Sequence, residues 1–136
     1  MARIRFRQLP HTADVRLAVY GKNEEELLRH LALGIGRLVL GRTPKGAPHT
    51  TSALPLTSPD LGARLVRVGN EVLFWLFTRR HATVDVALQG ENARLHLRRL
   101  PPTVQPLFEI KAVTAHALKP RQDPQRGLVA VLTLDL

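Results

Sequence analysis

Residues 10–14, Pro-His-Thr-Ala-Asp, bring an imidazole, a hydroxyl and a carboxylate into one short segment between two expected strands. These are side chains that can take part in chemistry. The simpler interpretation is turn formation, because Asp14 and Thr12 can cap backbone groups while His11 is merely polar. Taken alone, the segment favours the turn.

The sequence finishes with Leu134-Asp135-Leu136, so a side-chain carboxylate stands one residue before the terminal carboxylate. Two negative groups this close repel each other unless a cation lies between them. Ca²⁺ and Mg²⁺ prefer oxygen ligands of this kind. The alternative is that both groups lie in water at a frayed chain end, as such residues usually do.

Residues 109–116, Glu-Ile-Lys-Ala-Val-Thr-Ala-His, predict part of a strand with Lys111 near its apolar centre. A buried ammonium group needs an acidic partner or a phosphate. Glu109 shares the face of Lys111, because side chains two residues apart point the same way along a strand. His116 stands near the far end of the strand, where a structural and a functional role are equally open.

No motif typical of an enzyme is present. The sequence contains no Walker A loop, no Gly-x-Gly-x-x-Gly after a strand, no His-Glu-x-x-His and no Gly-x-Ser-x-Gly. The aromatic residues of segment 69–77, Trp75 included, are best interpreted as helix packing. The absence of cysteine excludes disulfides, thiolate metal sites and thiol nucleophiles.

The chain has 136 residues and a net charge of +9, with 16 arginines among its 20 basic residues. This excess predicts attraction to polyanions, nucleic acid before an anionic membrane, although arginine enrichment is also typical of GC-rich genomes. The first residues lack the hydrophobic run of a signal peptide, and the longest apolar stretch is too short to span a membrane. We therefore expect a soluble cytoplasmic protein without membrane contact.

Two helices are predicted to position these residues. Alternation predicts strands over 3–9 and 15–20, and Asn23 with Glu26 marks the start of a helix that runs to about residue 40. A short edge strand is expected over 50–56. Ser58 is the expected cap of a second helix, with Pro59 in its first turn and its end near 79–81.

Four strands are expected to follow, over 83–89, 93–99, 107–118 and 128–134, with a long polar hairpin tip at 119–127. The last of them is apolar on both faces, which predicts a place inside the sheet. This order indicates an α+β fold: a single domain over 1–136 with two helices packed on a mostly antiparallel or mixed sheet.

Taken together and in order, several segments resemble the archease family. They are His-Thr-Ala-Asp-Val at 11–15, Tyr-Gly-Lys at 20–22 before a helix that opens with Glu-Glu, Asn-Glu-Val-Leu-Phe at 70–74, Glu-Ile-Lys-Ala-Val-Thr-x-His at 109–116, and Leu-Asp-Leu at 134–136. Any one of them is a weak signal, but the ordered set spans nearly the whole chain.

The resemblance implies an accessory protein that is not itself an enzyme. Archeases are protein cofactors of the RtcB-type RNA ligase, which uses GTP and divalent metal to join RNA ends bearing a 3′-phosphate or 2′,3′-cyclic phosphate in tRNA splicing and RNA repair. They promote formation of the guanylylated ligase and sustain its turnover. The implied partner is therefore the ligase, and the implied association with RNA is indirect, through the ligase.

The resemblance also implies site residues. Family members bind a divalent metal, commonly calcium, through positions that correspond here to Asp14, Asp135 and the terminal carboxylate of Leu136. Lys111 corresponds to a lysine that the family needs for function, and His11 and His116 match motif positions. No residue is implied to be catalytic.

The chain departs from the family pattern at three places. Pro10 stands where an acidic residue is common, Ala115 where an aromatic residue is common, and Thr-Arg-Arg-His at 78–81 where an acidic stretch is common. Because Pro10 removes one candidate acidic ligand, we expect weaker calcium binding.

Two other functions stay open. In a stand-alone RNA-binding module, Arg3, Arg5 and Arg7 on one strand and Arg94, His96 and Arg98 on another would each line a phosphate-tracking face. A metal-dependent phosphoesterase would use His11, Asp14 and Asp135, although the chain lacks the dense set of His and Asp ligands of a two-metal centre.

Overall fold

The computed structural model describes residues 14–114 and 120–136. The strand predicted over 3–9, as well as His11 and His116, lies outside these ranges. In chain order the elements are β1 (Asp14–Gly21), α1 (Glu24–Leu40), β2 (Thr50–Pro55), α2 (Leu61–Thr78), β3 (His81–Gln89), β4 (Asn92–Arg99), β5 (Ala112–Thr114), β6 (Arg121–Asp123) and β7 (Gly127–Asp135).

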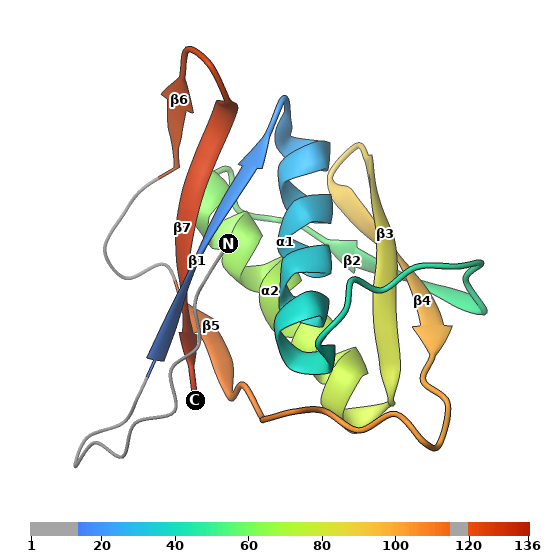
Figure 1. Cartoon of the computed structure of the whole chain (residues 1–136). Coiled ribbons are helices and arrows are strands. Elements are labelled where there is room, and N and C mark those ends of the chain that lie inside the picture. Colours follow the sequence, from blue (N-terminus) through green and yellow to red (C-terminus); the bar gives the residue numbers. More distant parts are fainter. Residues whose placement is uncertain (1–13, 115–119) are drawn as a thin grey trace.

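The described strands form two antiparallel sheets with the helices between them (Figure 1). One sheet has the order β1-β7-β5, with β6 also paired to β7, and the other has the order β2-β4-β3. The two helices pack against each other; α1 contacts β1 and β3, and α2 contacts β5 and β3. The predicted α+β class is confirmed, and the strands divide into two sheets where we expected one.

Local signals set the bounds of α1 as predicted. The side chain of Asn23 accepts a hydrogen bond of 2.9 Å from the backbone N–H of Glu26, which satisfies a free donor of the first turn. At the other end Gly41 adopts a left-handed conformation, φ 81°, and its N–H donates to the carbonyl of Arg37. Between these caps, Leu27, Leu31 and Ile35 are fully buried at helical spacing.

The start of α2 differs from the prediction. Asp60 is the N-cap, and its carboxylate accepts the N–H of Ala63 at 2.8 Å. Ser58, the expected cap, instead accepts the N–H of Asp60 at 3.1 Å. Both residues have suitable side chains, and the one whose oxygen reaches the N–H three residues ahead is the cap.

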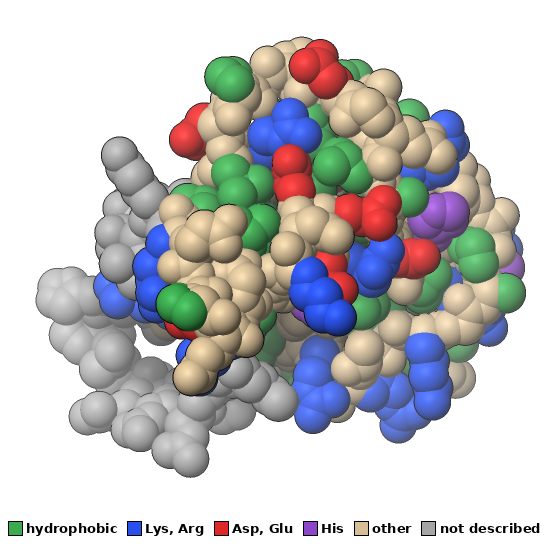
Figure 2. Space-filling model, turned by 90° about the horizontal axis from the view of Figure 1, so that it is seen from above, with side chains coloured by type: hydrophobic (Ala, Val, Ile, Leu, Met, Phe, Trp, Pro, Cys, Tyr) green, Lys and Arg blue, Asp and Glu red, His purple; other side chains and the backbone are tan. Residues whose placement is uncertain are grey.

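Acidic and basic side chains are paired around the start of α1. Arg64 lies 2.6 Å from Glu24, and Arg29 lies 2.6 Å from Asp85 and 3.5 Å from Glu25. Figure 2 looks onto this end of the molecule and shows basic and acidic side chains next to each other. The pair of Arg64 with Glu24 connects α2 to α1, and the pair of Arg29 with Asp85 connects α1 to β3, so both hold together elements that are distant in sequence.

The strand β7 is the centre of its sheet, as its apolar sequence predicts. It pairs with β1 along one edge and with β5 and β6 along the other. The strand β6 was not predicted, because residues 119–127 have the polar composition of a loop. Asp123 ends it by accepting the N–H groups of Gln125 and Arg126, and these backbone hydrogen bonds, that of Gln125 first, lower the pKa of Asp123.

The strand predicted over 107–118 is much shorter in the described residues. Residues 107–111 are not part of a sheet, and β5 covers Ala112–Thr114. The backbone N–H of Leu107 donates to the carbonyl of Val39 near the end of α1, and the Leu107 side chain is 64% exposed. At Leu107 a tertiary hydrogen bond to a helix thus takes the place of the expected strand pairing. No helix among the described residues has the length and hydropathy needed to cross a bilayer.

Candidate functional site

The register of the first sheet places Asp14 opposite Asp135. The strands β1 and β7 are antiparallel, and these two residues are direct partners at the end of the ladder. Directly opposed residues of an antiparallel pair project from the same face, with Cβ atoms about 5 Å apart. The adjacent pair, Val15 and Leu134, is buried against the helices, so the two carboxylates project from the opposite face of the sheet.

These two carboxylates, which we call the carboxylate pair, are not neutralised by neighbouring residues of the described chain. Within residues 14–114 and 120–136, neither Asp14 nor Asp135 forms an ion pair with Lys or Arg. Arg16 stands one pair further along the same face, opposite Thr133. Like charges directly opposite each other destabilise a sheet, so the pair is a place where a bound cation would lower the free energy.

The carboxylate pair supplies part of a cation site. Ca²⁺ takes six to eight oxygen ligands, and carboxylates are its most common ones. No cluster of three His, Cys, Asp or Glu side chains that could hold a metal occurs in the described parts of the chain. The two aspartates would therefore need further oxygen ligands, and the carboxylate of Leu136, the next residue after Asp135, is the predicted one.

Lys111 lies beside this pair through the backbone. Its N–H donates to the carbonyl of Asp135 at 2.7 Å, which extends the ladder between β5 and β7 by one bond. The prediction of a buried lysine at a strand centre is wrong: Lys111 precedes β5 and is exposed. No ion pair joins it to Glu109 among the described residues, because an exposed ammonium group in water needs no acidic partner.

The side chain of Lys111 borders a hollow of about 480 Å³ on the α2 side of the sheet. Its lining includes Asn70, Leu73, Phe74 and Phe77 from α2, together with Glu109 and Lys111. Ile110, which stands between Glu109 and Lys111, lines the same hollow, so this shared lining does not test the prediction that the two charged residues share a face. Ala112, which lies next to Lys111, is the register partner of Asp135, so the lysine and the carboxylate pair lie on opposite sides of one sheet end.

Asn70 fixes the edge of β5 and was not singled out by the sequence analysis. Its side-chain amide donates to the carbonyl of Val113 at 3.2 Å and accepts the N–H of Val113 at 2.9 Å. Gly69 permits this contact, since a Cβ atom there would lie 3.0 Å from the Val113 side chain. The available signals were a small residue, Gly69, within a predicted helix and the Asn-Glu-Val-Leu-Phe segment of the family resemblance, which begins at Asn70.

The aromatic residues of α2 divide into packed and exposed ones. The indole N–H of Trp75 donates to Glu71 at 3.0 Å and its ring packs edge-on against His81, so Trp75 packs as predicted. Phe74 is 41% exposed and lines the hollow next to Lys111. The guanidinium of Arg79 lies 5.8 Å from the centre of the Phe74 ring.

Comparison with known sequences identifies relatives over most of the chain. A sequence model of the archease protein family matches residues 6–136. The chain is 30% identical over 125 residues to the archease of Methanosarcina mazei, with 85% of each chain covered. It is 34% identical over 128 residues to the archease of Methanosarcina barkeri, with 84% of each chain covered.

Two solved structures have the same fold. The archease of Thermotoga maritima, described as a possible chaperone, superimposes with a TM-score of 0.73 at 22% identity, over 98% of this chain and 99% of that chain. A protein of Methanobacterium thermoautotrophicum solved in solution gives a TM-score of 0.63 at 20% identity, over 94% and 96% of the two chains. At these identities the likeness concerns the fold alone.

Proposed function

The chain belongs to the archease protein family, and from this premise we propose that it is a protein cofactor of an RtcB-type RNA ligase. It acts in tRNA splicing and RNA repair in the cytoplasm. There it promotes guanylylation of the ligase and repeated turnover, and it does not join RNA itself. The observation that carries the proposal is that the carboxylate pair and Lys111 lie at the same end of one sheet, on its two faces.

The carboxylate pair gives this cofactor a cation site. Asp14 and Asp135 are register partners, and they would hold a calcium-like ion together with the terminal carboxylate of Leu136. When bound, the ion supplies positive charge that phosphate groups or ligase carboxylates can share. Until then the repulsion between Asp14 and Asp135 favours capture of a cation.

Lys111 and the hollow form the second half of the proposed contact. The exposed ammonium group can bind a phosphate or a ligase carboxylate, since its charge is not taken up by an acidic neighbour in the described residues. Next to it, the exposed ring of Phe74 offers apolar area for a protein partner. A ligase that surrounds this end of the sheet would contact the carboxylate pair on one face, and Lys111 with the Phe74 ring on the other.

A ligation assay tests the proposal directly. The reaction contains a cognate ligase, GTP, Mn²⁺ and an RNA with a 3′-phosphate, with or without this protein. We expect the protein to accelerate joining and to increase the fraction of guanylylated ligase. The variants Asp14→Asn and Asp135→Asn should lose this stimulation while they remain folded by circular dichroism.

Glu91→Gln is the matched control, because Glu91 is an exposed carboxylate in the turn between β3 and β4, away from the pair. It removes the same charge and should stimulate like the unmodified protein. Full stimulation by Asp14→Asn and Asp135→Asn would refute the role of the pair. His11→Ala and His116→Ala, tested in parallel, would show whether these two predicted positions contribute.

Metal binding is tested separately by thermal denaturation. Calcium should raise the Tm of the unmodified protein above its value in chelator, because a ligand that binds only the folded state stabilises it. Asp135→Asn should show little or no such rise. An equal rise in both proteins would place the calcium elsewhere.

A further inference from the structure

A second hollow, of about 510 Å³, lies beside the end of α1, the start of β3 and the end of β4. Four basic residues border it, namely Arg42, Lys45, Arg98 and Arg99, and its apolar lining includes Leu40, Leu100 and Val104. We call it the basic groove. Of the described residues that line it, none is acidic. Its volume lies within the range of about 300–1,000 Å³ typical of ligand sites.

We propose that the basic groove binds the phosphodiester backbone of a single-stranded nucleic acid and accommodates one of its bases. This activity lies beyond the ligase-cofactor role, since the chain would contact nucleic acid directly and without the ligase. It also gives the charge of +9 a defined location.

The loop after α1 forms one wall of the groove and is held in place. Arg98 donates to the carbonyl of Ala47 at 2.7 Å, which ties this loop to β4. Gly46 allows the close approach: its φ is +112°, and a Cβ atom there would lie 3.1 Å from the Arg98 guanidinium. The wall is therefore formed before a ligand arrives, so little ordering entropy opposes binding.

The loop after β4 forms the other wall, and Arg80 holds it. The guanidinium of Arg80 donates to the carbonyls of Pro101 and Val104 at 3.0 and 2.7 Å, and its own carbonyl accepts the N–H of Leu100 at 2.8 Å. Arg80 has a φ of 53°, a conformation that residues other than glycine rarely adopt. These hydrogen bonds stabilise it and place Leu100 and Val104 in the groove.

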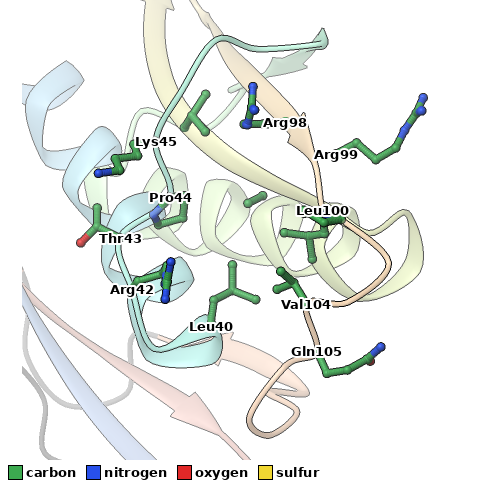
Figure 3. A pocket seen from close by; sticks show the side chains of 13 residues that line it. Leu40, Arg42, Thr43, Pro44, Lys45, Arg98, Arg99, Leu100, Val104 and Gln105 are labelled. Atoms are coloured by element: carbon green, nitrogen blue, oxygen red, sulfur yellow. The ribbon is translucent and has the colours of Figure 1, made fainter.

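The charges at the groove are available to a ligand. Arg42, Lys45 and Arg99 are exposed, and none of them forms an ion pair with a carboxylate in the part of the chain that the structure describes. Figure 3 shows Arg42 and Arg98 on different sides of the hollow, and Lys45 and Arg99 extended outward at its rim. A phosphate at the rim could be approached by these long side chains from several directions.

The groove continues into a row of polar side chains along β4. Arg94, His96 and Arg98 alternate with fully buried residues of the same strand, so they share the outer face of the sheet. Asp85 is the register partner of His96, but its carboxylate is engaged by Arg29 at 2.6 Å. A strand of nucleic acid could therefore follow β4 away from the groove along a predominantly positive face.

The chemistry of the groove favours a single-stranded nucleic acid over other polyanions. Arginine binds phosphate through a planar fork of N–H donors. The apolar lining offers a surface for the face of a base, and only an unpaired, unstacked base exposes that face. An acidic peptide would satisfy the charges of Arg42 and Lys45, but it would leave Leu100 and Val104 without an apolar partner.

Fluorescence anisotropy with the pure protein tests the proposal. The probes are short labelled RNA and DNA oligonucleotides of the same mixed sequence, titrated at several salt concentrations. We expect binding that weakens with salt. The double variant Arg42→Gln/Lys45→Gln should bind more weakly and reduce the slope of log K against log salt by about 1.4, about 0.7 for each cation removed from contact with a single strand.

Lys22→Gln/Arg126→Gln is the matched control. It removes the same charge from two exposed residues next to β1 and β7, away from the groove, and should keep most of the affinity. Arg42→Gln/Arg99→Gln serves as a second groove variant should the first be poorly folded.

Three results would overturn the proposal. They are equal losses of affinity in the groove and control variants, equally tight binding of poly-glutamate, and no binding of either oligonucleotide. The RNA and DNA arms tell which sugar is preferred.

Discussion

The start of α1 and the end of β7 both bear carboxylates, but their surroundings differ. At the start of α1, Glu24 lies 2.6 Å from Arg64, Glu25 accepts the N–H of Leu88 at 2.9 Å, and Glu26 accepts the N–H of Lys22 at 3.0 Å. Each carboxylate there has a partner that links α1 to its surroundings. Such pairing makes charge part of the structure, and little of it is left for a ligand.

At the end of β7 the opposite holds. Asp14 and Asp135 lie directly opposite each other, and neither forms an ion pair with Lys or Arg among the residues that the structure describes. The basic groove is similar with the sign reversed, since its arginines and lysine form no ion pair with a carboxylate of residues 14–114 and 120–136. Paired charges thus stabilise this protein, whereas unpaired charges are available to its partners. Substitutions at the two kinds of site should therefore have different effects on stability.

The largest effect is expected where charge is both paired and partly buried. Arg64→Ala removes the ion pair with Glu24 as well as hydrogen bonds to the carbonyls of Leu56 and Ser58. The side chain of Arg64 is only 13% exposed, so we expect the free energy of unfolding to fall by about 2–3 kcal/mol. Urea denaturation measures it. Arg67→Ala, one turn later and exposed, should cost less than half as much.

Asn70→Ala comes next in magnitude. It leaves the N–H and carbonyl of Val113 without their amide partner, which should cost about 1–3 kcal/mol. The amides of β5 should then exchange faster with solvent deuterium, and ligase stimulation should fall because β5, which directly follows Lys111, is held less firmly. Asn70→Asp, which keeps the acceptor and loses the donor, should be intermediate. Unchanged exchange in Asn70→Ala would show that β7 alone holds β5.

The sharpest test of the comparison sets two neutral substitutions against each other. Glu24→Gln should lower the free energy of unfolding, because it breaks the pair with Arg64. Asp135→Asn, measured in chelator, should leave it unchanged or raise it by about 0.2–1 kcal/mol, since it removes repulsion from Asp14. A loss of stability in Asp135→Asn similar to that in Glu24→Gln would mean that the carboxylate pair has a structural partner after all.

The smallest effect is expected at the basic groove. Arg42→Gln/Lys45→Gln removes two exposed charges that have no acidic partner among the described residues. Its free energy of unfolding should stay within about 0.5 kcal/mol of the parent value, as for most surface changes. A clear gain in stability would indicate that the groove stores repulsion between its own cations.

Elements with strong local signals could be predicted from sequence. Asn23 and Gly41 bound α1 because capping is decided within a few residues. The two-sided apolar pattern of residues 128–134 likewise placed β7 inside its sheet. By contrast, Leu107 lies outside the expected strand because its N–H bonds to Val39 at the end of a helix, a tertiary contact that no local pattern encodes.

The candidate site was predicted in its members and not in its geometry. Asp135 was indicated by its closeness to the terminal carboxylate and Asp14 by the family resemblance, but their direct opposition depends on the register of strands that are distant in sequence. Lys111 was expected to be buried, because the apolar residues around it were assigned to one long strand. The basic groove was not foreseen either, since it is assembled from two loops and two strands.

The pairing of β1 with β7 also determines which sheet can form first while the chain is being synthesised. The hairpin β3–β4 joins strands separated only by a turn, and with β2 it completes one sheet from residues 50–99. The other sheet forms only when β1 pairs with β7, its first and last described strands. Contacts between residues so distant in sequence form late in folding. A chain interrupted before β7 would thus carry much of the basic groove but no carboxylate pair, so the acidic site exists only on a protein whose synthesis has passed Asp135.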